Sequence, residues 1–279
     1  MPIVNISDTE EIYYQLIDGD KSKPYLVFLH EGLGCIDMWK GFPDDLCLKT
    51  GCRGLVYDRV GYGKSSAINT TRSINYLHEY ALKELPLIID QVIPNTPFII
   101  VGHSDGASIG LIYSAQQSEP LLGVISIAAH VMVENETCQG IALANEAWQA
   151  NKLNGLYKYH GDKTPQTFNA WAVTWLKPWF KYWNIEYLLP SIDVPILALQ
   201  GENDQYATNA QLNAIDTLST GDVYIHLVKD SAHSPHLDAK HEVIPLMLSF
   251  ITMLVKQANS SSGKVEHPQT QYKATLNNI

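Results

Sequence analysis

Short apolar runs bounded by glycine, proline, asparagine or aspartate recur along the chain and predict buried β-strands. These runs are Tyr25–His30, Gly54–Asp58, Phe98–His103, Leu122–Ala129, Ile196–Gln200 and Val223–Val228. Stretches of helical spacing lie between several of them, namely Ile74–Val92, Ala107–Gln117 and Asn209–Leu218. Near-continuous apolar strands that alternate with helices are typical of a parallel sheet covered on both faces. Glu11–Ile17 alternates more strongly and predicts an edge strand or one half of a hairpin.

The alternation stops between residues 131 and 190, a stretch that holds all but one of the six tryptophans and no convincing strand. A helical insertion between two strands of one sheet explains this pattern better than a second domain. We therefore predict an α/β core made of residues 1–130 and 191–256, with residues 131–190 as a helical cap. Residues 257–279 are polar and predict a loose C-terminal tail.

Composition narrows the class of protein. The chain has 279 residues, of which 46% are hydrophobic, and this is enough for a sizeable core. Lys and Arg total 19 against 29 Asp and Glu, a formal charge of −10, and no basic cluster interrupts the acidic balance. We therefore expect no nucleic-acid partner, because the net negative charge of the protein would repel the phosphates.

Cysteine content and hydropathy bear on the cellular compartment. The four cysteines are too few and too scattered for a disulfide framework or a metal site, so we expect free thiols and no metal. The N-terminus lacks the pattern of a secretory signal. The longest uncharged apolar stretch, Val243–Val255, has 13 residues and contains Pro245, whereas a membrane span needs about 20. We expect no membrane span and a cytoplasmic location.

The sequence Gly102-His103-Ser104-Asp105-Gly106 follows an apolar strand and precedes a helical stretch. A G-x-S-x-G pentapeptide between a strand and a helix places its serine on a sharp, strained turn, where large neighbours would not fit. The turn exposes the hydroxyl at the carboxyl end of the sheet. It also directs the backbone N–H of Asp105, at the start of the helix, toward developing negative charge.

A serine hydroxyl needs a base that is itself oriented by a carboxylate. Asp204 lies in the loop after one predicted strand and His233 in the loop after the next. In a parallel sheet both loops emerge at the same edge as the serine, so we predict that Ser104, Asp204 and His233 converge. Glu202 and Asp230 are the rival acids. Asp204 is preferred because the G-x-x-D turn after the strand lets its side chain reach.

Two glycine-containing loops complete the set. His30-Glu31-Gly32-Leu33-Gly34 follows a strand, and a turn there is a candidate for the second oxyanion donor, the backbone N–H of Gly32 or Leu33. Gly63-Lys64-Ser65 imitates the end of a phosphate-binding loop, but that motif requires glycine where Asp58 stands. We interpret the second loop as a structural turn in which Asp58 and Arg59 bond to neighbouring loops.

Taken together, these motifs resemble the α/β-hydrolase superfamily, specifically its cap-bearing esterase-like members. The resemblance extends from about residue 20 to residue 256 and rests on five motifs that occur in the same order. They are His30-x-Gly32, Asp58-Arg59-x-Gly61-x-Gly63-x-Ser65, Gly102-x-Ser104-x-Gly106, Gly201-x-x-Asp204 and His233-x-Pro235. The resemblance implies an eight-stranded, mostly parallel sheet, helices on both faces, a helical cap and hydrolysis through an acyl-enzyme. One departure is that the usual His-Gly pair reads His30-Glu31 here.

The expected activity is that of a serine hydrolase that cleaves a carboxylic ester with a Ser-His-Asp triad and without a cofactor. The substrate would be a small molecule or an acyl group on a carrier protein, since similar capped esterases demethylate a pimeloyl ester on acyl carrier protein during biotin synthesis. Two alternatives stay open: a ligand-binding protein on the same fold, and an enzyme of this fold that cleaves C–C or amide bonds.

Overall fold

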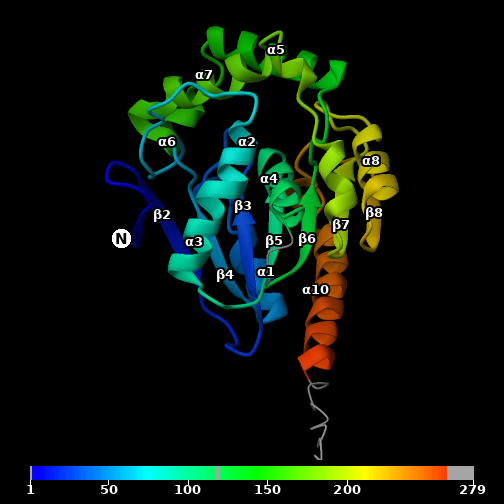
Figure 1. The fold of residues 1–279 in the computed structure, drawn as a ribbon. Coiled ribbons are helices and arrows are strands. Elements are labelled where there is room, and N and C mark those ends of the chain that lie inside the picture. The colour runs from blue at the N-terminus through cyan, green and yellow to red at the C-terminus, as the bar shows by residue number, and fades with distance from the viewer. Residues whose placement is uncertain (1, 117–119, 263–279) are drawn as a thin grey trace, which may run out of the picture.

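A computed structural model describes residues 2–116 and 120–262 of the chain. Eight strands form one sheet in the order β1-β2-β4-β3-β5-β6-β7-β8 (Figure 1). Their bounds are β1 Ile3–Asn5, β2 Glu11–Ile17, β3 Tyr25–Leu29, β4 Arg53–Tyr57, β5 Phe98–His103, β6 Leu121–Ile127, β7 Ile196–Gly201 and β8 Val223–Val228. Strand β2 pairs antiparallel with β1 and β4, and all other neighbours are parallel. The predicted mostly parallel, eight-stranded sheet is confirmed.

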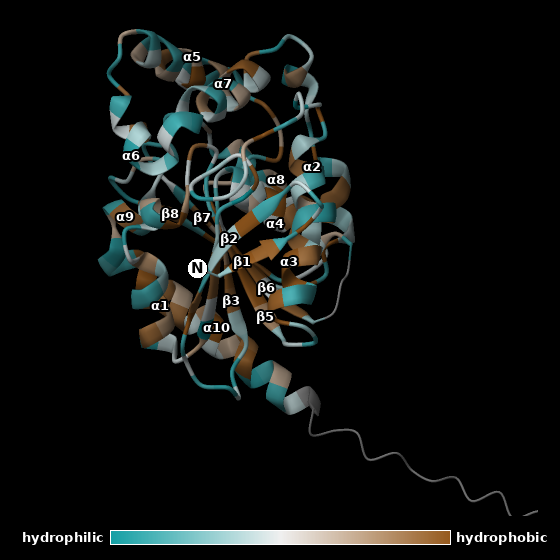
Figure 2. Ribbon diagram, turned by 90° about the vertical axis from the view of Figure 1, so that its left-hand side faces the viewer, coloured by the Kyte–Doolittle hydropathy of each residue, from teal (hydrophilic) through white to brown (hydrophobic). Residues whose placement is uncertain are grey.

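Helices cover both faces of the sheet. The helices are α1 Phe42–Thr50, α2 Tyr76–Glu79, α3 Leu85–Val92, α4 Asp105–Ser114, α5 Asn135–Gln149, α6 Tyr157–His160, α7 Thr164–Trp175, α8 Ala210–Leu218, α9 Pro235–Asp238 and α10 Lys240–Ser262. In Figure 2 the brown, apolar strands lie between α1 on one side and α3 and α4 on the other. Alternation along β3 supplies both layers: Leu26 and Phe28 join the core beneath α1 and α10, while Val27 and Leu29 join the core beneath α3 and α4.

Helix α10 is the largest element that the apolar pattern did not identify as a helix. Val243, Met247, Ile251 and Leu254 recur at helical spacing and are buried against the sheet. By length and composition alone, Lys240–Ser260 is long and apolar enough to cross a membrane, a test that core helices also pass. The 13-residue apolar run in the sequence is therefore shorter than the helix that contains it.

The expected tail needs a correction at its start. Residues 257–262 were assigned to a loose tail, but they continue α10 as far as Ser262. The helix carries on because these residues include no proline and no glycine to end it before Gly263. The remaining tail, residues 263–279, lies outside the described residues.

Helices α5, α6 and α7 lie between β6 and β7 in the sequence and sit above the carboxyl ends of the strands (Figure 1). His160, at the end of α6, fastens this cap to the core. Its Nε2 lies 2.8 Å from the Leu33 carbonyl oxygen, and its Nδ1 accepts the Gly63 N–H at 3.0 Å. Lys163 donates to the carbonyl oxygens of Tyr62 and Ser65.

A π-helical segment, Tyr80–Glu84, joins α2 to α3 and brings a carboxyl group into the core. Glu84 is 5% exposed; its Oε2 accepts the Val60 N–H at 3.1 Å, and its Oε1 has no hydrogen-bond partner among the described residues. Burial raises the pKa of Glu84 to about 8, against the lowering effect of the Val60 N–H and the Arg59 charge. The folded protein therefore keeps a proton on this carboxyl group at neutral pH.

Replacing Ile251 tests the packing of α10. Ile251→Ala should lower the free energy of unfolding by about 2–5 kcal/mol, because it leaves a cavity under the helix. Thr252→Ala, one residue along and exposed, should change it by less than about 0.5 kcal/mol. Urea unfolding followed by circular dichroism measures both, and equal effects would contradict the packing of α10 on the sheet.

Glu84→Gln should change how stability depends on pH. The unfolded chain releases the Glu84 proton near its ordinary pKa, whereas the folded protein holds it up to about pH 8. Stability of the natural protein should therefore fall as pH rises from about 4.5 to about 8, because the unfolded state binds fewer protons. Glu84→Gln removes this contribution, so its advantage over the natural protein should grow across that range. Glu79→Gln, at an exposed position, should show no such trend in urea unfolding.

Candidate active site

Ser104 lies on the sharp turn between β5 and α4. Its backbone adopts φ 54° and ψ −120°, a conformation that residues other than glycine seldom adopt. The two glycines of the motif are required by close contacts: a Cβ on Gly102 would overlap the Gly106 carbonyl oxygen, and a Cβ on Gly106 would overlap the Leu29 carbonyl oxygen. The Ser104 N–H donates to the Ile127 carbonyl at 2.8 Å, which ties the turn to β6.

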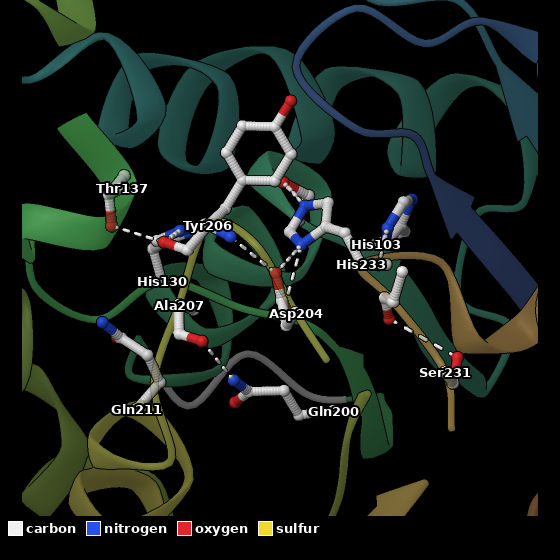
Figure 3. Close-up of polar contacts among 12 residues, drawn as sticks. His103, His130, Thr137, Gln200, Asp204, Tyr206, Ala207, Gln211, Ser231 and His233 are labelled. Carbon is white, nitrogen blue, oxygen red and sulfur yellow. Dashed lines mark hydrogen bonds and ion pairs between the residues drawn. The ribbon is translucent and has the colours of Figure 1, made fainter. Parts of the chain in front are cut away.

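The structure brings the three predicted polar side chains into one hydrogen-bonded series. Ser104 Oγ lies 2.9 Å from His233 Nε2, and His233 Nδ1 lies 2.9 Å from both carboxylate oxygens of Asp204. Figure 3 shows His233 between the Asp204 carboxylate and the Tyr206 ring. Donation by Nδ1–H to the carboxylate fixes the tautomer in which Nε2 can accept the serine proton.

Asp204 is held in place by the loop that follows β7. Its Oδ1 accepts the Tyr206 N–H at 2.9 Å, and its side chain is 1% exposed. Burial raises the pKa of Asp204, but the hydrogen bond and charge of His233 outweigh burial and hold the pKa below its ordinary value. Asp204 is therefore a carboxylate at neutral pH.

The two rival acids do not contact His233. Glu202 and Asp230 are exposed and meet each other, with the Asp230 N–H 3.3 Å from Glu202 Oε2. His103, which precedes Ser104 in the sequence, has its Nε2 2.8 Å from the His233 carbonyl oxygen and thus supports the histidine loop. His236, in the first turn of α9, is buried against Trp39.

The candidate oxyanion turn follows β3 directly. The Gly34 N–H donates to the Glu31 carbonyl at 3.1 Å, so Gly32 and Leu33 occupy the two central positions, whose N–H groups the turn itself does not use. Arg59 holds the turn from behind by donating to the carbonyl oxygens of His30 and Glu31. Asp58 accepts the N–H groups of Ile36 and Lys64. The structural role predicted for Asp58 and Arg59 is confirmed.

A cavity of about 100 Å³ lies under the cap, against these residues. Its lining residues come from both the core and the cap: Glu31, Gly32, Leu33, Ser104, Asp105, His130, Thr137, Ile141, Trp171, Trp175, Tyr206 and His233. All six predicted site residues except Asp204 are among them, and Asp204 lies behind His233. The lining of the cavity is mostly apolar, and its acidic groups are the carboxylates of Glu31 and Asp105.

Several residues of the cavity had no signal in the sequence. His130, just after β6, is buried with its Nε2 3.2 Å from the Tyr206 carbonyl oxygen, which also accepts the Thr137 hydroxyl at 2.7 Å (Figure 3). Burial lowers the pKa of His130, so its ring is neutral at neutral pH. A lone histidine after a strand carries no motif, and only the folded chain places it here.

A second unforeseen series reaches from the cap to the serine turn. Trp175 Nε1–H donates to the Tyr76 hydroxyl at 2.8 Å, and that hydroxyl donates to Asp105 Oδ2 at 2.7 Å. All three side chains are buried. The series fixes the orientation of Asp105 at the start of α4 and joins α7 of the cap to the residue beside Ser104.

Known proteins match both the sequence and the fold. A model of the alpha/beta hydrolase fold matches residues 24–172, more than half of the chain. The chain belongs to the alpha/beta hydrolase family, a family of hydrolases in which the nucleophile sits on such a turn.

Individual relatives are named for different reactions. The chain is 31% identical over 103 residues to a proline iminopeptidase of Lactobacillus helveticus, covering 37% of this chain and 34% of that protein. The match thus spans about a third of this curated relative. A proline iminopeptidase from Mycobacterium smegmatis has a TM-score of 0.69 at 17% identity, covering 92% of this chain and 99% of that one. An esterase from Exiguobacterium antarcticum has a TM-score of 0.70 at 19% identity, with coverages of 90% and 98%. These two structures show the shared fold.

Replacing the acid tests the hydrogen-bonded series. Asp204→Asn keeps the shape but favours the tautomer in which His233 Nε2 carries the proton, so kcat should fall by about 10⁴ with little change in KM. Glu202→Gln and Asp230→Asn remove nearby exposed charges and should each cost no more than about tenfold. One ester substrate and a pH series compare the three variants. An active Asp204→Asn beside a crippled Glu202→Gln or Asp230→Asn would refute this assignment of the acid.

Proposed function

We propose that this protein is a serine hydrolase that cleaves carboxylic esters of short acyl groups through an acyl-enzyme on Ser104. The observation that carries the proposal is the Ser104–His233–Asp204 series beside the cavity, with both hydrogen bonds at 2.9 Å. A serine poised in this way has a base within reach and a carboxylate that orients the base.

The residues suggest a complete reaction course. His233 Nε2 takes the Ser104 proton as Oγ attacks the ester carbonyl, and Asp204 stabilises the imidazolium that forms. The N–H groups of Asp105 and of Gly32 or Leu33 bind the oxyanion. His233 then gives its proton to the departing alcohol. In the second half, water loses a proton to His233 and attacks the acyl carbon; the bond to Ser104 Oγ then breaks as His233 returns that proton to Oγ, which releases the acid. No step requires a cofactor.

The size of the cavity supports short acyl groups. Pockets for drug-sized ligands measure about 300–1,000 Å³, whereas this cavity measures about 100 Å³. It is small for the long pimeloyl chain of a carrier-bound methyl ester. Lys163 of the cap, a cation that an acidic carrier protein could meet, is already engaged with the core carbonyl oxygens of Tyr62 and Ser65. The cavity therefore favours small-molecule substrates.

Amide cleavage is the second candidate. The same groups would attack an amide, with His233 protonating the departing amine. The proline iminopeptidase of L. helveticus, 31% identical over a third of its length, supports this candidate by its name. An ester is the easier substrate for the same acyl group, so ester turnover is tested first.

A fluorophosphonate probe and p-nitrophenyl esters test the proposed function. The probe should form one adduct, located at Ser104 by peptide mass spectrometry. The p-nitrophenyl acetate and propionate should turn over faster than the octanoate. Ser104→Ala should fold normally and lose kcat by a factor on the order of 10⁶, because the attacking oxygen is gone.

The outcomes separate the classes of function. Labelling of Ser104 without turnover of any ester or amide would favour a ligand-binding protein. Activity above a few per cent in a Ser104→Ala variant of unchanged Tm would show that another residue is the nucleophile.

A further inference from the structure

The charged groups that line the cavity are all acidic. Glu31 and Asp105 contribute carboxylates, and no lysine or arginine lines the cavity within the described residues. A carboxylate that faces a small, mostly apolar cavity loses part of its hydration and is stabilised by a positive or hydrogen-donating partner. The acidic residues that line the cavity therefore indicate which kind of acyl group binds there.

Asp105 has an unused acceptor. The residue is 2% exposed, and its Oδ2 accepts the Tyr76 hydroxyl at 2.7 Å. Its Oδ1 accepts no hydrogen bond from any residue that the structure describes, although Asp105 lines the cavity. A carboxylate oxygen that is left free beside a mostly apolar cavity is well placed to accept a hydrogen bond from a bound ligand. The Tyr76 hydroxyl holds the carboxylate in place, so the unused oxygen is preorganised.

Glu31 adds a second negative charge. Its side chain is 23% exposed and lines the cavity, with Oε2 3.5 Å from His103 Nδ1. Burial raises the pKa of Glu31, but the neighbouring His103 ring outweighs burial, so the pKa lies below its ordinary value. The positive charge of Arg59, which lies behind the turn after β3, partly offsets the negative charges of Glu31 and Asp105. Its Nη1 and Nη2 donate to the backbone carbonyls of His30 and Glu31, and neither is bonded to a carboxylate.

Aromatic rings complete the environment of a cation. Trp171, Trp175 and Tyr206 line the same cavity, and aromatic faces attract ammonium groups. Trp171 is 8% exposed, and its ring nitrogen carries a hydrogen-bond donor, Nε1–H. This donor lies against Gly32, where a Cβ would overlap it; the same Cβ would be 3.3 Å from Asp105 Cγ. A donor and an acceptor thus flank Gly32, which suits an amine and a carbonyl oxygen on neighbouring carbons.

We propose that the acyl group transferred to Ser104 is an α-aminoacyl group, whose protonated amine is bound by Asp105 Oδ1 within the cavity. The inference rests on the proposed function, since it names the substrate class of the same site. Trp171 Nε1–H then faces the carbonyl side of the same acyl group. Glu31 and the aromatic rings stabilise the ammonium without a direct hydrogen bond.

Three ethyl esters of one shape test this inference in the natural protein. Glycine ethyl ester, ethyl glycolate and ethyl propionate present an ammonium, a hydroxyl and a methyl group at the same position. At slightly acidic pH, where the amine is protonated, kcat/KM for the glycine ester should exceed that for the propionate by at least about tenfold, equivalent to about 1.4 kcal/mol.

Two variants locate the preference. Asp105→Asn keeps the shape and the backbone N–H but removes the charge, so the ratio of kcat/KM between glycine and propionate esters should fall by about tenfold or more. Glu202→Gln, an exposed acid outside the cavity, is the matched control and should leave the ratio unchanged. The ratio isolates amine recognition from any general loss of activity, because both substrates react at the same serine.

Each result decides something. A natural protein that hydrolyses ethyl propionate as well as the glycine ester would overturn the inference and leave ester hydrolysis at Ser104 standing. A preference that survives in Asp105→Asn would overturn the role of Asp105. If none of the three esters is hydrolysed, the inference is also overturned. Fluorophosphonate labelling of Ser104 then shows whether the proposed function fails as well.

Discussion

The close packing of α4 against the end of β3 is the constraint on which the rest of the site depends. Only a glycine at position 106 lets the helix approach the Leu29 carbonyl oxygen. This approach forces the chain to turn sharply at Ser104, with its positive φ. It also places the start of α4 beside the turn that continues from β3 through Gly32 and Leu33. Nucleophile and candidate oxyanion donors are therefore positioned by one contact between a helix and a strand.

The cap takes part in this arrangement through polar contacts with the core. Trp175 reaches Asp105 through Tyr76, and Thr137 meets the Tyr206 carbonyl oxygen next to the loop of Asp204. Glu134 in addition accepts the Thr208 N–H at 3.0 Å and Gln211 Nε2 at 2.6 Å. These bonds connect the cap to the serine turn and to the segment after β7 that carries Asp204. Orientation of the site and placement of the cap are thus parts of one network.

The features that sequence could predict are those with a strong local cause. The strands follow continuous apolar runs, and the serine turn follows a glycine pattern with a single steric explanation. The choice of Asp204 over Glu202 and Asp230 followed from the reach of a turn, and the structure places Asp204 alone against His233. The features that the sequence did not predict depend on contacts between segments that are distant in the chain. Neither His130 nor Tyr76 belongs to a motif, and the length of α10 was hidden by Pro245 and by its polar final turns.

The attachment of His160 has a consequence for how ligands enter and leave. One ring bonds the candidate oxyanion turn and the Gly63 loop together, and burial lowers the pKa of His160, so its neutral ring can donate from one nitrogen and accept at the other. A cap pinned there and again near Tyr206 cannot rise as a rigid lid without breaking several buried hydrogen bonds. Exchange with solvent is therefore expected to proceed by rotation of side chains at the cavity mouth, on the fast timescale of rotamer changes rather than that of domain motions. Entry would then itself select for molecular size, because a ligand must pass between side chains that turn while the cap stays in place.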